Sequence, residues 1–163
     1  MASYNFIRLK RLMLIYRVVQ VVLLGLLLFM AFNFQKLFTL MGVPALFMQS
    51  VIAAIAFQLM MTYPAWLLAR RDVAVEIESS QTELTGDQLM ALRRRRLGGD
   101  LWKLCIMGFF IVFIMMAPDV TKTRAMSSVL AATYFGFLLI SITYFQCFNF
   151  LARRKQLELT ATN

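Results

Sequence analysis

Four stretches of this sequence are long and apolar enough to cross a lipid bilayer: residues 12–32, 43–69, 101–117 and 125–152. A membrane-spanning helix needs about 20 mostly apolar residues, because the hydrocarbon layer is about 30 Å thick. Apolar residues also make up 61% of the 163-residue chain, more than a soluble domain of this size can bury. We therefore expect an all-α integral membrane protein whose four transmembrane helices form one bundle and a single domain over residues 1–163.

The basic residues are distributed unequally between the segments that flank these spans. Fourteen of the 17 lie in or beside the N-terminus, the loop 70–100 and the C-terminal tail. The other three, in the loops 33–42 and 118–124, are Lys36, Lys122 and Arg124. Lysine and arginine accumulate on the cytoplasmic side of membrane proteins, so both termini and the loop 70–100 are expected in the cytoplasm. We expect the membrane to be a bacterial inner membrane.

The chain lacks the residues on which most metal and nucleophile chemistry depends. It contains no histidine, and its two cysteines, Cys105 and Cys147, do not form a CxxC pair. Zinc, haem and iron–sulfur sites, and Ser-His-Asp or Cys-His catalysis, need residues of these kinds in larger numbers. The 12 methionines are more typical of apolar packing than of a copper site. We expect a protein without enzyme activity, cofactor or metal.

The loop 70–100 divides into an acid-rich part, residues 72–87, and a basic part. Between them, Thr85-Gly-Asp-Gln88 matches a capping box, in which threonine satisfies a helix-start amide and Gln88 reaches back to the chain. The following leucines fall close to one helical face. This pattern predicts a short amphipathic helix that leads into Gly98-Gly99 and the third span.

The basic part of the loop is the run Arg93, Arg94, Arg95 and Arg96. These arginines fix the orientation of the chain and can bind anionic lipid headgroups, which is the role we favour. Two alternatives are docking on an acidic partner and folding onto the acid-rich half of the same loop. The chain has neither the stacking aromatics nor the fold typical of nucleic-acid binding, so we expect no nucleic-acid partner.

Small residues recur at helical spacing in two of the spans. Ser128, Ala132 and Gly136 follow one another every four residues in the fourth span, and Ser50 and Ala54 begin a similar row in the second. Such rows let two helix backbones approach closely. They predict helix packing, either within the chain or against another protein.

Four glutamines also lie within the spans: Gln20, Gln49, Gln58 and Gln146. An amide in lipid needs a hydrogen-bonding partner, which typically lies on another helix. No ionisable group accompanies them at mid-depth, so we interpret them as interhelical contacts rather than as a polar pathway.

These features predict a non-catalytic membrane subunit, an accessory, assembly or anchoring component of a larger complex. Its partners would be membrane lipids and other membrane subunits or further copies of the chain, with the loop 70–100 as the docking element. The alternative is a homo-oligomeric channel or small transporter with a glutamine-lined pathway.

Overall fold

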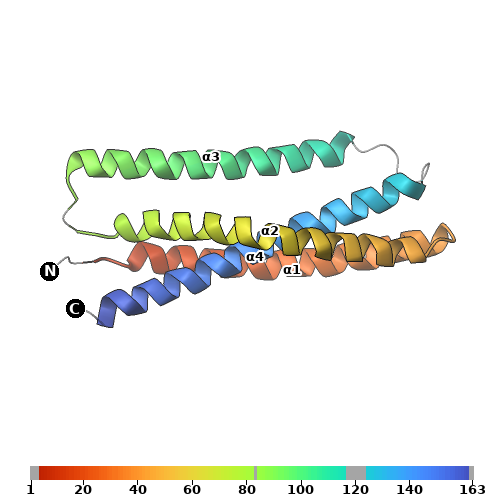
Figure 1. Cartoon of the computed structure of the whole chain (residues 1–163), viewed down its shortest axis with the longest axis horizontal. Helices are drawn as coiled ribbons and strands as arrows, with labels where there is room; N and C mark the ends of the chain where they lie inside the picture. The colour runs from red at the N-terminus through yellow and green to blue at the C-terminus, as the bar shows by residue number, and fades with distance from the viewer. Residues whose placement is uncertain (1–3, 83, 117–123, 162–163) are drawn as a thin grey trace.

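Four long helices make up almost all of the chain in a computed structural model, which describes residues 4–82, 84–116 and 124–161 (Figure 1). The helices are α1 (Ile7–Leu40), α2 (Ala45–Glu78), α3 (Gly86–Met116) and α4 (Arg124–Ala161). Within these described ranges there is no β-strand, only an isolated bridge between Tyr4 and Gln81. The predicted all-helical class is confirmed.

Three of the helices are long and apolar enough to cross a membrane: α1, α2 and the part of α4 over Ser127–Ala161. The fourth predicted span, residues 101–117, coincides with the second half of α3 and ends one residue beyond the described part of that helix. A fourth crossing therefore stays a prediction.

Both termini and the turn between α2 and α3 lie at one end of the bundle, and the turn between α1 and α2 lies at the other (Figure 1). The first of these ends is called the charged end below, because it holds the ionisable residues of segments 8–11, 70–103 and 153–158. A chain that crosses a membrane an even number of times is expected to have both of its ends on the same side, as they are in this bundle.

Two of the segments predicted as loops, 33–42 and 70–100, are mostly helical. α1 continues through most of the predicted loop 33–42, and only residues 41–44 connect it to α2. α2 and α3 together take up most of the predicted loop 70–100, which leaves a turn over residues 79–85. The prediction ended the first two spans where polar or charged residues begin, but alanine, glutamate and arginine are good helix formers. The predicted loop 118–124 lies, except for Arg124, outside the described residues.

The predicted short amphipathic helix is not a separate element. Gly98 and Gly99 lie inside α3, which runs without a break over residues 86–116. The helix start carries one arm of the predicted cap, because the backbone N–H of Thr85 donates a hydrogen bond to Gln88 Oε1 at 3.1 Å. The arginine run and the apolar half of α3 are therefore parts of one rigid rod.

The buried side chains form two clusters, one toward each end of the bundle. The cluster near the charged end includes Leu9, Ala69 and Phe148, and the cluster near the opposite end includes Phe38 and Phe135. α1, α2 and α4 contribute to both clusters, and the contact between α2 and α4 is the most extensive of any helix pair.

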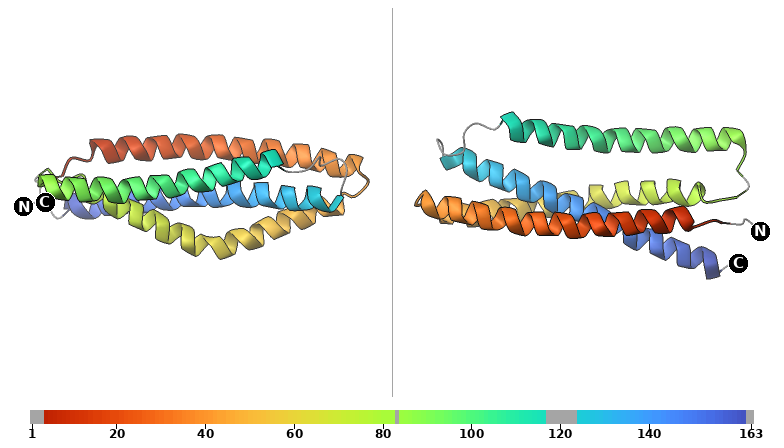
Figure 2. Two further views of the ribbon diagram at one scale, coloured as in Figure 1. Left: turned by 90° about the horizontal axis from the view of Figure 1, so that it is seen from above. Right: turned by 180° about the vertical axis from the view of Figure 1, so that it is seen from behind.

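α2 bends near its middle, as the left view of Figure 2 shows. Pro64 lies inside this helix. A proline ring has no N–H to donate and clashes with the preceding helical turn, so it kinks the helix. The bend falls between the parts of α2 that pack in the two buried clusters.

The turn between α1 and α2 depends on a glycine in the left-handed conformation. Gly42 has a φ of 70°, and its N–H bonds to the carbonyl oxygen of Thr39. The N–H of Val43 bonds to the carbonyl oxygen of Phe38 at 3.0 Å. This pair of bonds is a Schellman motif, and the two side chains at its ends, Phe38 and Val43, pack in the same buried cluster.

We expect Gly42→Ala to lower the free energy of unfolding by about 1 kcal/mol, because a Cβ is strained in the left-handed region. Gly25→Ala is the matched control, since Gly25 is helical and a Cβ there meets open space. It should have no effect or stabilise slightly. Unfolding in detergent, followed by circular dichroism, measures both changes, and equal effects at the two positions would contradict this account of the turn.

Candidate functional site

Two carboxylates lie one helical turn apart on α2 at the charged end. Only 9% of the Glu76 side chain and 13% of the Asp72 side chain is exposed. A buried carboxylate is costly unless cations or hydrogen-bond donors surround it. Because their spacing is i, i+4, both side chains leave α2 on the same face, toward the other helices.

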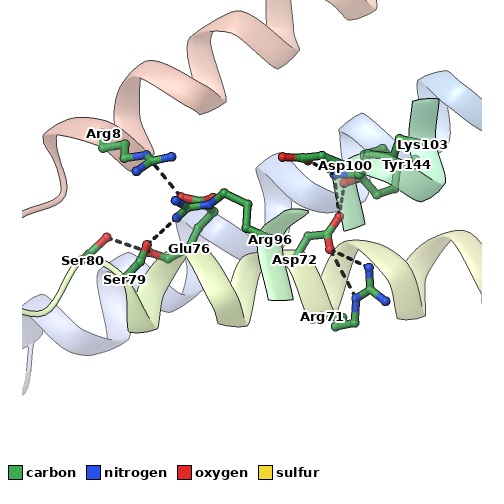
Figure 3. A network of polar contacts seen from close by, with 10 residues as sticks. All are labelled: Arg8, Arg71, Asp72, Glu76, Ser79, Ser80, Arg96, Asp100, Lys103 and Tyr144. Carbon is green, nitrogen blue, oxygen red and sulfur yellow. Dashed lines mark hydrogen bonds and ion pairs between the residues drawn. The ribbon is translucent and has the colours of Figure 1, made fainter. Parts of the chain in front are cut away.

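Glu76 joins α2 to α3 and α1 (Figure 3). Its Oε1 lies 2.7 Å from Nε of Arg96 on α3, and its Oε2 lies 3.8 Å from Nε of Arg8 on α1. Arg96 also donates from Nη2 to Ser79 Oγ at 2.9 Å. The short contact to Arg96, whose side chain is 20% exposed, is the principal ion pair of this carboxylate.

Asp72 joins α2 to α3 and α4 (Figure 3). Its Oδ2 lies 2.8 Å from Nζ of Lys103 on α3, and it accepts a hydrogen bond from the hydroxyl of Tyr144 on α4 at 2.6 Å. Nζ of Lys103 also lies 5.3 Å from the centre of the Tyr144 ring and 3.6 Å from Asp100. We call the set Arg8, Asp72, Glu76, Arg96, Lys103 and Tyr144 the ionic cluster.

A glycine lets α3 approach α2 at this cluster. A Cβ at Gly99 would lie 3.0 Å from Nη2 of Arg71 and 3.4 Å from Oδ1 of Asp72. The absence of a side chain at Gly99 therefore allows the backbone of α3 to lie close to Arg71 and Asp72 of α2. Arg71 itself contacts Asp72 Oδ1 at 3.3 Å.

Away from the ionic cluster, α3 is the helix least packed against the others (Figures 1 and 2). Near the opposite end, the Phe110 ring stacks on Phe137 of α4, with ring centres 3.8 Å apart, and meets the edge of Tyr134 at 5.4 Å. The structure thus attaches α3 by charges at one end and by aromatic rings farther along.

The four arginines of the predicted contact run have different environments. Arg96 points into the bundle, and Nη1 of Arg95 lies 3.9 Å from Glu78, in a pair whose side chains are both exposed. Arg93 and Arg94 are exposed. Two of the four arginines thus fold onto acidic residues of α2, and the other two point into the surroundings.

The small-residue rows of α2 and α4 meet within the chain. Oγ of Ser50 lies 2.9 Å from Oγ of Ser128, and Ala54 is buried. A Cβ at Gly136 would lie 3.3 Å from Cδ1 of Phe57. Ala132 is only half-buried and lies at the edge of the buried face of α4. The residues at the centre of that face are Ser127, Ala131, Phe135 and Leu138.

The structure brings two of the four glutamines into interhelical contacts. Gln20 of α1 donates to the carbonyl oxygen of Ile142 at 3.3 Å, and Nδ2 of Asn149 donates to its Oε1 at 3.2 Å. Gln58 of α2 donates to the Thr143 hydroxyl of α4. The remaining two, Gln49 and Gln146, are exposed. The four amides therefore do not form a continuous row.

The sequence predicted the folding of the arginine run onto the acid-rich segment only as an alternative, which the Arg96–Glu76 pair bears out. The rest of the ionic cluster was missed, although a signal for it exists. Asp72 and Glu76 follow an apolar span directly and have the i, i+4 spacing of one helical face. Because both residues were assigned to a loop, their spacing was not taken to place them on one helical face. Arg96 was included in the predicted site, whereas Arg8, Lys103 and Tyr144 were not.

The members of the cluster other than Tyr144 line a cleft of about 860 Å³ between α1, α2 and α3. The buried carboxylates and cations of the cluster face one another, an arrangement that holds helices together.

In the described part of the chain, no group of three or more His, Cys, Asp or Glu residues could hold a metal ion. Cys105 is exposed and Cys147 is half-buried.

Comparison of the chain with protein-family models, with curated proteins and with solved structures finds no match.

We expect Asp72→Asn to lower the free energy of unfolding by about 3 kcal/mol, because it leaves the Lys103 cation without its close carboxylate. Glu78→Gln is the control, since the pair of Glu78 with Arg95 is long and exposed, and it should cost less than about 1 kcal/mol. The double variant Asp72→Asn/Lys103→Met should recover at least half of the loss. Denaturation of the purified chain in detergent measures all three, and equal losses for Asp72→Asn and Glu78→Gln would contradict the role of the cluster.

Proposed function

We propose that this chain is a non-catalytic subunit of a larger membrane complex, an accessory, assembly or anchoring component. Its charged end faces the cytoplasm, as the distribution of lysine and arginine favours, and its membrane is a bacterial inner membrane. The observation that carries the proposal is the incomplete packing of α3, which is attached to the bundle through the ionic cluster and Phe110.

One face of α3 is suited to a helix from another subunit. Leu104, Ile111 and Met115 lie on this face and are exposed. Gly108 lies between them, and a Cβ there would meet nothing within 4 Å. A glycine among apolar residues permits close approach of a second helix backbone, which is how helices associate in membranes without a hydrophobic driving force.

The ionisable groups of the cluster support a structural role rather than a catalytic one. The carboxylates of Asp72 and Glu76 each have a close cation from α3, and Arg96 and Lys103 are engaged by those same carboxylates. Such pairs neutralise one another and fix the position of α3. We do not favour the glutamine-lined channel, because Gln20 and Gln58 use their amides to bind α4.

Affinity purification of the full chain from its native membrane in mild detergent, followed by native mass spectrometry, tests the proposal. We expect one or more unrelated chains in fixed stoichiometry. Gly108→Leu should reduce the recovered partner at least about fivefold, which corresponds to about 1 kcal/mol of association free energy.

Gly25→Leu is the matched control, because Gly25 of α1 also faces open space. It should leave recovery of the partner unchanged. A stable ring of identical chains without any other component would contradict the subunit proposal. Equal losses with both leucine variants would contradict the assignment of the contact to α3.

A further inference from the structure

A cleft of about 860 Å³ opens at the charged end between the start of α1, the end of α2 and the start of α3. Ile7, Leu12 and Ile15 of α1 give it an apolar wall, and Ser79 and Ser80 contribute hydroxyl groups. This volume is in the range of small-molecule sites and exceeds what a single inorganic ion would fill. The cleft therefore fits a ligand with both a polar and an apolar part.

Positive charge is in excess around the cleft. Its lining contains five cationic side chains and three carboxylates: Arg8, Arg11, Arg95, Arg96 and Lys103 against Asp72, Glu76 and Asp100. Glu76 and Asp72 already have close partners in Arg96 and Lys103, at 2.7 and 2.8 Å. The cations that remain exceed the carboxylates available to them, so the cleft favours an anionic ligand.

Three arginines have side chains available to such a ligand. Arg8 is 65% exposed at 3.8 Å from Glu76, and Arg95 is 69% exposed at 3.9 Å from Glu78. Long, exposed ion pairs of this kind contribute little, so these guanidinium groups can turn to another anion at small cost. Arg11 is exposed as well. Guanidinium groups donate paired hydrogen bonds to phosphate oxygens, which makes a phosphate the best-matched anion.

The apolar wall continues from the cleft along α1. Ile7 and Ile15 at its edge are exposed, and so are Val18 and Val22 farther along the helix. In the most apolar 18 residues of α1, 0% are buried inside the bundle. A ligand whose phosphate sits in the cleft can therefore lay a hydrocarbon chain on α1 without leaving an apolar surface.

We propose that this cleft binds the headgroup of an anionic phospholipid, with its phosphate between Arg8, Arg11 and Arg95 and its acyl chains along α1. This assignment differs from the contact predicted at Arg93 to Arg96. Arg96 is engaged by Glu76, and Arg93 and Arg94 do not line the cleft. The cleft holds this lipid whether or not the chain has a protein partner.

Native mass spectrometry of the full chain, titrated with phosphatidylglycerol in detergent, tests the site. The double variant Arg8→Gln/Arg11→Gln should weaken binding of this lipid at least about tenfold, since each basic residue near a headgroup contributes substantially. Arg93→Gln/Arg94→Gln removes the same charge from neighbouring exposed positions outside the cleft and should weaken binding less than about twofold. Arg11→Gln alone, which breaks no ion pair of the ionic cluster, should weaken binding measurably in a chain that unfolds like the wild type.

Two further ligands distinguish the source of the phosphate. Phosphatidylcholine, which carries no net charge, should bind more weakly than phosphatidylglycerol, and glycerol 3-phosphate should bind far more weakly because it lacks acyl chains. Equal weakening by the two double variants would overturn the proposal, since it would reveal only general attraction between opposite charges. Binding of glycerol 3-phosphate as tight as that of phosphatidylglycerol would overturn the assignment to a lipid.

Discussion

The position of α3 in the bundle depends on the need to neutralise two carboxylates buried at the end of α2. Asp72 and Glu76 leave the same face of that helix, and neither is accessible enough to be stabilised by water alone. Their close partners come from two other helices: Arg96 and Lys103 from α3, and Tyr144 from α4. Arg8 of α1 adds only a long, exposed contact at 3.8 Å. The ionic cluster thus holds the start of α3 in place, and Phe110 holds it farther along, although α3 makes few other contacts with its neighbours.

Helix length explains why this cluster can exist in a chain of such apolar composition. At about 1.5 Å per residue, the 34 residues of α1 or α2 extend for about 51 Å, well beyond a hydrocarbon layer of about 30 Å. Helices of this length therefore extend beyond the hydrocarbon layer. Their charged turns lie in these extensions, where they contact one another. The cleft that we assign to a phospholipid headgroup lies among these charged turns. The apolar face of α3 around Gly108, which we propose binds a second helix, is exposed farther along the bundle.

The sequence was sufficient for the helical class and for the three helices long and apolar enough to span a membrane, because apolar runs of that length have few alternative structures. It also contained the rows headed by Ser50 and Ser128, which meet in the structure. The ends of the helices could not be predicted in this way, because a charged residue stops a span without stopping a helix. Most of the ionic cluster was missed for the same reason, since Asp72 and Glu76 share one face only when this segment is helical. The pairing of the arginine run with the acid-rich segment had been open as an alternative, and Arg96 with Glu76 realises it. The Schellman turn at Gly42 depends on a backbone conformation that hydropathy does not reveal.

A double-mutant cycle on Glu76 and Arg96 tests most directly whether the ionic cluster attaches α3 to the bundle. Glu76→Gln, Arg96→Gln and the double variant, unfolded in detergent, should show a coupling free energy of about 1–3 kcal/mol, as expected of a close, largely buried pair. The same cycle on Glu78 and Arg95, which are exposed and 3.9 Å apart, should give less than about 0.5 kcal/mol. Coupling between Glu76 and Arg96 no larger than that of the exposed pair would contradict the account.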